Sequence, residues 1–246
     1  MKGQRAEKKS RKSKKGSPKT QPTGGKSSQK TATRDKILEA ATRVFAEHPY
    51  SAASIRMVGK TAGIDHPLIS YYFPTKAELF EAVVKDVAET YVQANTSWFE
   101  GLEELSASTG LSLYLDRLFD FTSEHPEALR IVALNLVQPE ESAITPGYRQ
   151  MQGLLTRNTE TFRKVAALQS SAREIRMFTE SFNTMVINYL GAATYYAGIL
   201  GMDPRGRTYR RWVKEAILLL FLPRLKQLIR GEDQETSNAK RASATR

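Results

Sequence analysis

The chain has 246 residues, no cysteine, three histidines and a formal net charge of +11. This length allows one or two domains with a substantial core. The lack of cysteine excludes disulfides, thiolate metal sites and a thiol nucleophile, and it fits a reducing cytoplasm, where we expect the chain to act. Because the histidines are scattered singly, we expect neither a zinc centre nor a cofactor.

The excess positive charge lies at the N-terminus. Residues 1–32 carry eleven Lys and Arg against one acid, Glu7, whereas residues 33–246 carry 26 basic and 25 acidic residues. The N-terminal segment is rich in Lys, Ser, Gly and Thr and nearly empty of apolar residues. Such a segment cannot offset its ordering entropy, so we expect residues 1–32 to form a disordered basic tail.

The first predicted helix begins near Thr33. Its apolar residues recur at positions i, i+3, i+4, i+7 and i+8, which is the pattern of an amphipathic helix. It should end by His48, because the residue before Pro49 is disfavoured in the helical region. The apolar stripe consists of Ile37, Ala40, Ala41, Val44 and Phe45.

Residues 54–73 contain two short helical patterns joined by a turn. Gly63 can take the positive φ that ends the first helix abruptly. Asp65 stands at an N-cap position, and Pro67 stands in the first turn of the second helix, where its missing N–H costs nothing. The first helix places on one face Ile55, Val58, Gly59 and Ala62.

The second of these helices should bury Ile69 and Phe73. Its outward residues are then His66, Leu68, Ser70 and Tyr71. Two helices with a glycine-containing turn form a helix-turn-helix, whose second helix can lie in the major groove of DNA. We therefore expect a DNA-binding head.

After the head, Pro74 and Thr75 restart the chain. Thr75 and Glu78 match a capping box, so a fourth helix should begin here. The remaining helices are expected at residues 111–123, 127–137, 148–168, 173–200 and 207–229, followed by a flexible tail at 232–246. Because no segment alternates with a period of two, the predicted fold is all-α with about nine helices.

Residues 181–202 form a run without charge that is long enough to cross a bilayer. Asn183, Asn188 and Thr194 lie within this run, which favours a helix buried in a bundle or at a subunit interface. We therefore expect no membrane partner.

Residues 33–83 resemble the DNA-binding domain of the TetR-type (tetracycline-repressor) family of bacterial transcriptional regulators. The segments that carry the resemblance are TRDKILEAATRVFAE, SIRMVGKTAGI and ISYYFPTKAELF, together with Tyr50. The resemblance implies a DNA-binding domain at 33–80 and a helical ligand-binding and dimerisation domain at 81–231. Ala53 replaces the usual Thr, which leaves Ser54 or Ser51 to cap the second helix.

The family pattern implies two sets of DNA contacts. An imidazole and a hydroxyl can bind base edges, and small apolar groups can touch thymine methyls. The base-facing set is His66, Pro67, Leu68 and Ser70. The phosphate-facing set is Tyr71, Lys76, Arg56 and Thr33.

The same resemblance implies a homodimer on a palindromic DNA operator, with a small and hydrophobic effector bound between the middle helices. The two last long helices would make the dimer interface, where the expected stripe is Trp212, Ile217, Leu220 and Phe221. The expected ligand-pocket residues are large or polar on mostly apolar faces: Trp98, Tyr114, Phe119, Asn135, Met151, Phe182, Asn188 and Tyr189.

Two further readings stay open. The chain could bind DNA constitutively, with a helical half that only dimerises, and the basic tail could either bind DNA phosphates or merely increase solubility. An enzyme is not expected, because the sequence has no Gly-rich dinucleotide loop, nucleophile elbow or metal-ligand spacing. The operator, the effector and the direction of regulation are not encoded in any motif.

Overall fold

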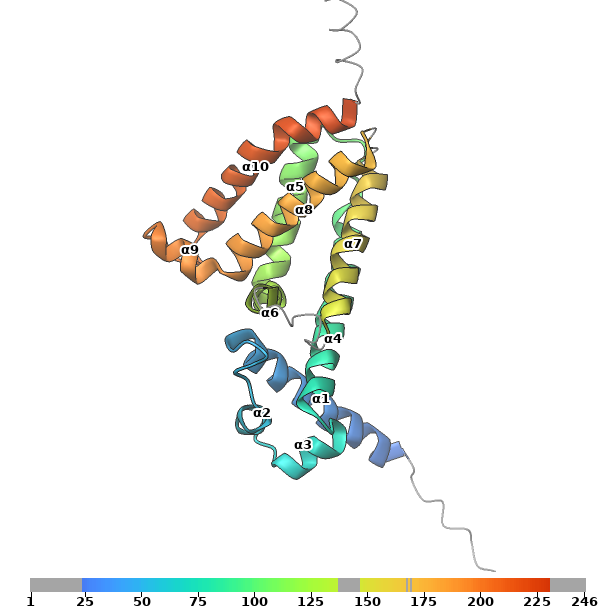
Figure 1. Cartoon of the computed structure of the whole chain (residues 1–246), viewed down its shortest axis with the longest axis vertical. Helices are drawn as coiled ribbons and strands as arrows, with labels where there is room; N and C mark the ends of the chain where they lie inside the picture. The colour runs from blue at the N-terminus through green and yellow to red at the C-terminus, as the bar shows by residue number, and fades with distance from the viewer. Residues whose placement is uncertain (1–23, 137–146, 167, 169, 231–246) are drawn as a thin grey trace, which may run out of the picture.

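The computed structural model describes residues 24–136, 147–166, 168 and 170–230. These residues form ten α-helices and one π-helical turn and contain no strand, which confirms the expected all-α class. Figure 1 shows a small helical head joined by one long helix to a larger helical body.

The head consists of α1 (Gly24–Glu47), α2 (Ile55–Ala62), α3 (His66–Tyr72) and the first part of α4 (Lys76–Trp98). Its core is the predicted one, because the apolar stripe of α1 is buried against the other three helices. The rings of Phe45 and Phe80 meet edge to face with centroids 4.7 Å apart. Since α4 runs from this core into the body, the two parts share one rigid element (Figure 1).

The start of α1 differs from the prediction. The helix begins at Gly24 rather than near Thr33, so residues 24–32 belong to α1 and not to a disordered tail. Extending an existing helix avoids the cost of nucleation. The extension also gains contacts with α3 that no local pattern reveals, since Lys30 binds Tyr71 and Arg34 lies over Phe73. The rest of the predicted tail, 1–23, lies outside the described residues, as does the C-terminal tail.

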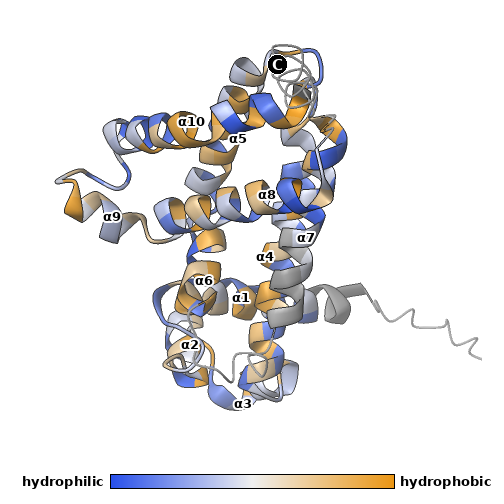
Figure 2. Cartoon of the chain, turned by 45° about the horizontal axis from the view of Figure 1, so that its top comes forward, coloured by the Kyte–Doolittle hydropathy of each residue, from blue (hydrophilic) through white to orange (hydrophobic). Residues whose placement is uncertain are grey.

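The body consists of the remainder of α4 with α5 (Ala107–Glu124), α6 (Pro126–Leu136), α7 (Tyr148–Val165), α8 (Ala172–Val186), α9 (Ala193–Ile199) and α10 (Arg207–Arg230). The predicted bounds of α5, α6, α7 and α10 agree with these to within a few residues. Figure 2 shows α9 at the edge of the body, where the chain turns back between α8 and α10.

The predicted helix at 173–200 is wrong as a single element. It is divided into α8, a π-helical turn η2 (Ile187–Gly191) and α9. Gly191 packs directly on α6, where an added Cβ would lie 2.5 Å from the carbonyl oxygen of Leu129 and 2.8 Å from the Cβ of Ala133. The wider π turn brings the backbone this close, and only glycine fits. Among the described residues, no helix has the length and apolar character that crossing a membrane requires.

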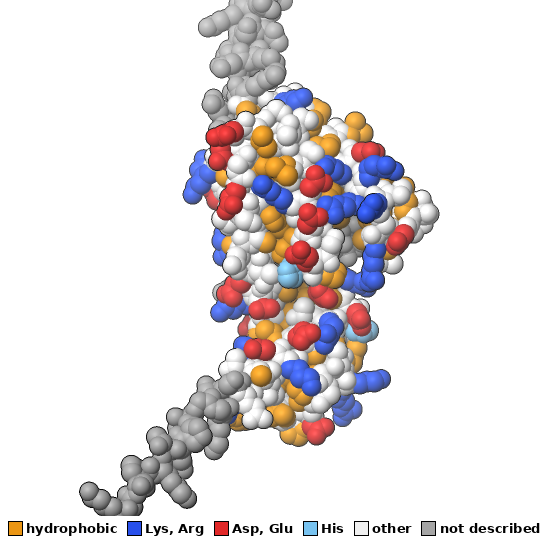
Figure 3. Space-filling model, turned by 180° about the vertical axis from the view of Figure 1, so that it is seen from behind, with side chains coloured by type: hydrophobic (Ala, Val, Ile, Leu, Met, Phe, Trp, Pro, Cys, Tyr) orange, Lys and Arg blue, Asp and Glu red, His pale blue; other side chains and the backbone are white. Residues whose placement is uncertain are grey.

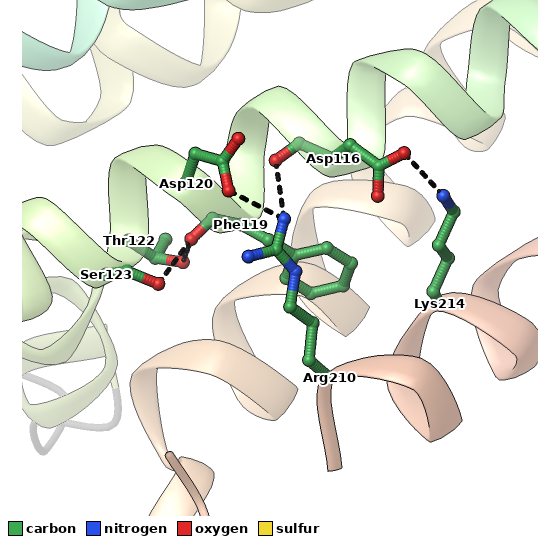
Figure 4. A network of polar contacts seen from close by, with 7 residues as sticks. All are labelled: Asp116, Phe119, Asp120, Thr122, Ser123, Arg210 and Lys214. Atoms are coloured by element: carbon green, nitrogen blue, oxygen red, sulfur yellow. Dashed lines mark hydrogen bonds and ion pairs between the residues drawn. The ribbon is translucent and has the colours of Figure 1, made fainter. Parts of the chain in front are cut away.

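A network of polar contacts connects the first turns of α10 to α5 (Figure 4). The guanidinium of Arg210 donates to the Asp120 carboxylate at 2.7 Å and to the Asp116 carbonyl at 3.1 Å, and it lies 5.2 Å from the centroid of the Phe119 ring. The Lys214 ammonium binds the Asp116 carboxylate at 2.6 Å. These contacts fix the register of α10, and therefore the surface that it presents.

Candidate nucleic-acid interface and ligand cavity

Both ends of α2 agree with the predictions from the sequence. The Ser54 hydroxyl accepts the backbone N–H of Met57 at 3.3 Å, so Ser54 caps α2. Gly63 ends α2 with φ 62°, in the left-handed region as predicted.

Asp65 occupies the N-cap of α3 but makes no side-chain cap bond, in contrast to the expectation. An N-cap side chain normally binds the N–H of the second or third helical residue. Here the second is Pro67, which has no N–H, and the third, Leu68, donates to the backbone carbonyl of Asp65 at 3.0 Å. The carboxylate is therefore left at the surface.

The outward face of α3 is held by two buried anchors. Ile69 is fully buried and Phe73 is 5% exposed. The predicted base-facing residues His66, Pro67 and Leu68, which precede Ile69, are exposed, and Ser70, which follows it, is half-buried. The His66 Nδ1 and the Ser70 Oγ lie 3.4 Å apart, so both hydrogen-bonding groups meet on one turn of the helix.

Tyr71 adds a hydroxyl at the far end of this face and is 65% exposed. It accepts a hydrogen bond from the Lys30 ammonium at 3.2 Å, and this bond raises the pKa of Lys30. Sequence analysis missed Lys30, because it assigned that residue to the tail. Arg56 is exposed in the first turn of α2, as expected for a phosphate contact.

Thr33 does not start α1, in contrast to the expectation. It lies within the helix, and its hydroxyl donates to the carbonyl of Gln29 at 3.0 Å. Its backbone N–H therefore does not belong to the free amides of a helix N-terminus, and its contact with a phosphate stays a prediction from the family pattern.

Lys76 has a structural role that sequence analysis did not anticipate. Its ammonium donates to the carbonyls of Tyr50 at 2.9 Å and Ala53 at 3.2 Å, and it lies 4.4 Å from the centroid of the Tyr50 ring. Of its three N–H donors, two thus hold the loop between α1 and α2. Next to it, Thr75 caps α4 by accepting the N–H of Glu78 at 3.1 Å.

Asn135 connects the body to the head. It is 1% exposed, and its Oδ1 accepts the backbone N–H of Tyr50 at 3.0 Å while its Nδ2 donates to the carbonyl of Ile131 at 2.8 Å. The amide is therefore committed to the junction of α6 with the α1–α2 loop. Asn135 was expected in the ligand pocket, but its oxygen faces this junction, its nitrogen is bonded within α6, and it does not line the cavity of the body.

The body contains a small cavity of about 20 Å³ between α5, α7 and α8. A space of this size holds about one water molecule. Aromatic rings dominate its wall, and no charged side chain lines it. The lining residues are Leu111, Tyr114, Phe162, Phe178, Thr179, Phe182 and Asn183.

Tyr114 and Phe182 are the only two predicted pocket residues that line this cavity among the described side chains. Trp98 instead packs edge to face on Tyr91, Tyr114 and Phe121, and Phe119 is covered by Arg210. The side chain of Met151 lies outside the described part of the chain.

The other two predicted pocket residues lie elsewhere. Asn188 is exposed and donates to the carbonyl of Thr184 at 2.8 Å. Tyr189 packs on Tyr196 and Trp212. Helical periodicity selected these residues because they stand on apolar faces, but it does not reveal which faces leave space between them.

The expected dimer stripe on α10 divides in two. Ile217 is fully buried and Phe221 is packed edge to face on Phe178 and Phe182, so both contribute mainly to the interior of their own chain. Trp212 is half-buried beside Tyr189. Leu220 points outward and is 57% exposed.

Other large apolar residues that sequence analysis did not select are exposed on the body, and one of them, Met177, lines the same surface hollow as Leu220. They lie on α8, α9 and α10, which are consecutive in the chain. These residues are Met177, Tyr195, Ile199 and Leu219. The adjoining exposed residues Met177, Leu219 and Leu220 form an apolar surface where α8 packs on α10.

Comparison with known proteins agrees with this architecture. Residues 37–83 match the family model for bacterial regulatory proteins of the tetR family. The chain is 28% identical over 135 residues to the HTH-type transcriptional repressor NicS of Pseudomonas putida, which covers 54% of this chain and 63% of that protein. It is 24% identical over 115 residues to the HTH-type transcriptional regulator RutR of Escherichia coli, 47% and 53% of the two chains. The chain thus spans little more than half the length of the curated relatives it matches.

Solved structures share the fold over nearly their whole length. The fatty acid degradation regulator FadR of Bacillus halodurans has a TM-score of 0.57 at 17% identity, with 76% of this chain and 94% of that chain covered. A tetR-family transcriptional regulator of Streptomyces coelicolor has a TM-score of 0.54 at 17% identity, with 88% and 99% covered. At this identity the likeness concerns the fold alone.

Proposed function

We propose that the chain, whose residues 37–83 match the tetR family of bacterial regulatory proteins, is a ligand-responsive transcriptional repressor of that family. In this proposal it binds a palindromic DNA operator as a homodimer and is released by a small hydrophobic effector. The observation that carries the proposal is the outward face of α3, where hydrogen-bonding side chains stand exposed on a helix with a fully buried anchor.

The base-facing and phosphate-facing roles follow from the chemistry of that face. The imidazole of His66 and the hydroxyl of Ser70 bind base edges, and Leu68 contacts thymine methyls. Tyr71 and Arg56 bind phosphates, which fix the position of α3 without reading sequence. Lys76 has one N–H left for a phosphate, so its main contribution is to hold the loop that precedes α2.

The exposed apolar side of α8, α9 and α10 supports the homodimer. Leu219 and Leu220 are 76% and 57% exposed, and Met177 is 59% exposed on the neighbouring α8. Burying such side chains against a second copy removes apolar surface from water. A two-fold dimer then places two α3 helices about one DNA turn, or a multiple, apart, which requires a palindromic operator.

The cavity between α5, α7 and α8 supports an effector that is neutral and apolar or aromatic. Its wall offers aromatic rings, with the hydroxyl of Thr179 and the amide of Asn183 as polar groups. Ligand pockets usually hold about 300–1,000 Å³. Because the cavity is far smaller, the effector must separate α7 and α8 from α5, and it stabilises the conformation in which they are apart.

A contiguous set of contacts links that movement to DNA. The cavity wall residue Phe182 lies on α8, which continues into η2, and η2 packs on α6 through Gly191. Asn135 at the end of α6 holds the backbone of Tyr50 in the head. A displacement of α8 is therefore expected to change the position of α6, and with it the position of the head.

In vitro selection of bound DNA with the purified full-length protein tests the proposal. We expect a palindromic sequence, and we expect His66→Ala to relax the preference at one or two base positions by about 1–3 kcal/mol. Tyr71→Phe should instead weaken binding to all sequences equally. Enrichment of no sequence over random DNA would contradict the proposal.

A constitutive DNA-binding protein is the second candidate function. The water-sized cavity is the observation that favours it. A screen of small apolar compounds for release of the selected operator separates the two candidates. The ligand-responsive function is supported if one compound releases the operator and if bound operator in turn lowers the affinity for that compound, because coupling between two ligands is reciprocal.

A further inference from the structure

The N-terminal part of α1 runs beside the C-terminal end of α3. The Lys30 ammonium lies 3.2 Å from the Tyr71 hydroxyl and 5.7 Å from the centroid of its ring, and the Arg34 guanidinium lies 5.2 Å from the centroid of the Phe73 ring. Lys30, Arg34 and Ile37 follow one another at spacings of four and three, so they share one face of the helix. This face is apolar inside the head and becomes cationic where α1 passes over α3.

No ion pair among the described residues neutralises the positive charge on this face. None of the ion pairs among the described residues includes Lys30 or Arg34, and the first turn of α1 contains no acid. Two cations four residues apart repel each other. Residues 1–23, which lead into this helix, carry nine Lys and Arg against one acid, Glu7.

Elsewhere the charges are mixed. Residues 33–246 carry nearly equal numbers of basic and acidic residues, and Figure 3 shows acidic and basic side chains interspersed over one face of the molecule. A polyanion that approaches α3 therefore meets the positive charges of Lys30 and Arg34 at the start of α1, and such an excess favours polyanions.

We propose that Lys30 and Arg34 form a second DNA contact of the head, which binds the phosphate backbone next to Tyr71 and reads no base sequence. This inference rests on the proposed function in one respect, namely that α3 faces DNA. Because the Lys30 ammonium and the Tyr71 hydroxyl are within hydrogen-bonding distance, one phosphate oxygen can accept from both. The guanidinium of Arg34, one turn further along, has the planar donor geometry that suits an adjacent phosphate.

Such contacts release counterions from DNA, so they are measured by the salt dependence of binding. For B-DNA, the slope of log Kobs against log[salt] is about −0.9 for each phosphate neutralised. A dimer would lose four contacts in the double variant Lys30→Ala/Arg34→Ala. The slope should therefore become less steep by about 3.6, and the loss of affinity between about 50 and 200 mM salt should shrink on the order of 100-fold.

The experiment uses the full-length protein on both the selected operator and a random-sequence duplex. Lys36→Ala is the matched control, because Lys36 is exposed on another face of the same helix. Lys30→Arg/Arg34→Lys keeps the charges and should keep the wild-type slope. Far-UV circular dichroism and the mass of the dimer in solution verify that each variant folds.

Different results would contradict the second DNA contact and the proposed function. The inference is overturned if the double variant, correctly folded, keeps the wild-type salt slope on the random duplex, or if it changes the preferred operator sequence. The proposed function is overturned if the wild-type protein does not prefer any sequence, whatever the slopes are. A less steep slope on both duplexes with an unchanged base preference supports the second contact.

Discussion

Gly191→Ala tests the packing of η2 against α6. The new Cβ would lie 2.5 Å from the Leu129 carbonyl oxygen and 2.8 Å from the Ala133 Cβ. Comfortable non-bonded contacts need about 3.5 Å, so the two elements must separate by on the order of 1 Å. The Leu129 atoms belong to the backbone of α6 and cannot rotate away.

Overpacking of this kind costs about 1–3 kcal/mol. We therefore expect the free energy of unfolding of Gly191→Ala to fall by about that amount, which for a chain of this size corresponds to about 2–4 °C in Tm for each kcal/mol. Operator affinity should fall as well, because α6 carries Asn135, which binds the backbone of Tyr50.

Urea unfolding followed by circular dichroism measures the change, and Gly198→Ala is the control. A Cβ at Gly198 in α9 has nothing within 4 Å, so this variant should be as stable as the wild type or more stable by up to about 1 kcal/mol, because alanine favours a helix more than glycine does. If both variants unfold at the same urea concentration, the packing argument is wrong.

Three further predictions follow from individual contacts. Leu220→Glu places a charge on an exposed apolar side chain and should convert the proposed dimer to a monomer in sedimentation experiments; a dimer of unchanged affinity would place the interface elsewhere. Lys76→Met removes two hydrogen bonds to the carbonyls of Tyr50 and Ala53 and should lower the free energy of unfolding by about 1–3 kcal/mol, whereas a lysine that only contacts DNA would leave the unfolding midpoint unchanged. The Tyr209 hydroxyl donates to the carbonyl of Tyr189 at 2.7 Å, and burial, followed by the nearby Tyr189 and Tyr196, raises the pKa of Tyr209 from 10.0 to about 12. Since the pKa of Tyr209 is higher in the folded than in the unfolded chain, the stability that its protonated hydroxyl contributes is complete below pH 10 and is lost as the pH rises toward about 12. Tyr209→Phe should therefore lower the free energy of unfolding by about 1 kcal/mol at neutral pH. It should also make the fall of that free energy at alkaline pH less steep.

The head could be predicted in detail because its signals are local. Ser54 as a cap, Gly63 at positive φ and Pro67 in the first turn of α3 each follow from the conformational preference of one residue. The start of α1 could not be predicted in this way. Its first turns are polar and cationic, and their contacts with Tyr71 and Phe73 join residues about forty positions apart in the chain.

In the body, hydrophobic periodicity predicts less of the structure than local signals do in the head. The pattern locates the helices and their apolar faces, but Phe182 lines a cavity while Ile217, equally apolar and equally periodic, fills the core. Which of these occurs depends on the pairing of helices, and pairing is not encoded within one helix. The π turn could not be predicted for the same reason. Glycine is needed at position 191 because the backbone of α6 lies against it, and not because of its neighbours in the sequence.

Tyr50 has contacts with both the head and the body. Its backbone N–H binds Asn135 of the body, its carbonyl accepts from Lys76 at the start of α4, and its ring packs 4.9 Å from the centroid of Phe80. The loop before α2 is therefore held from two sides by elements that also reach the body. A movement of α6 relative to α4 cannot leave both bonds intact, so the loop must follow one helix or the other. We expect α2 and α3 to change their position in either case, which would give the proposed effector a mechanical route to DNA that does not pass through the proposed DNA-facing residues themselves.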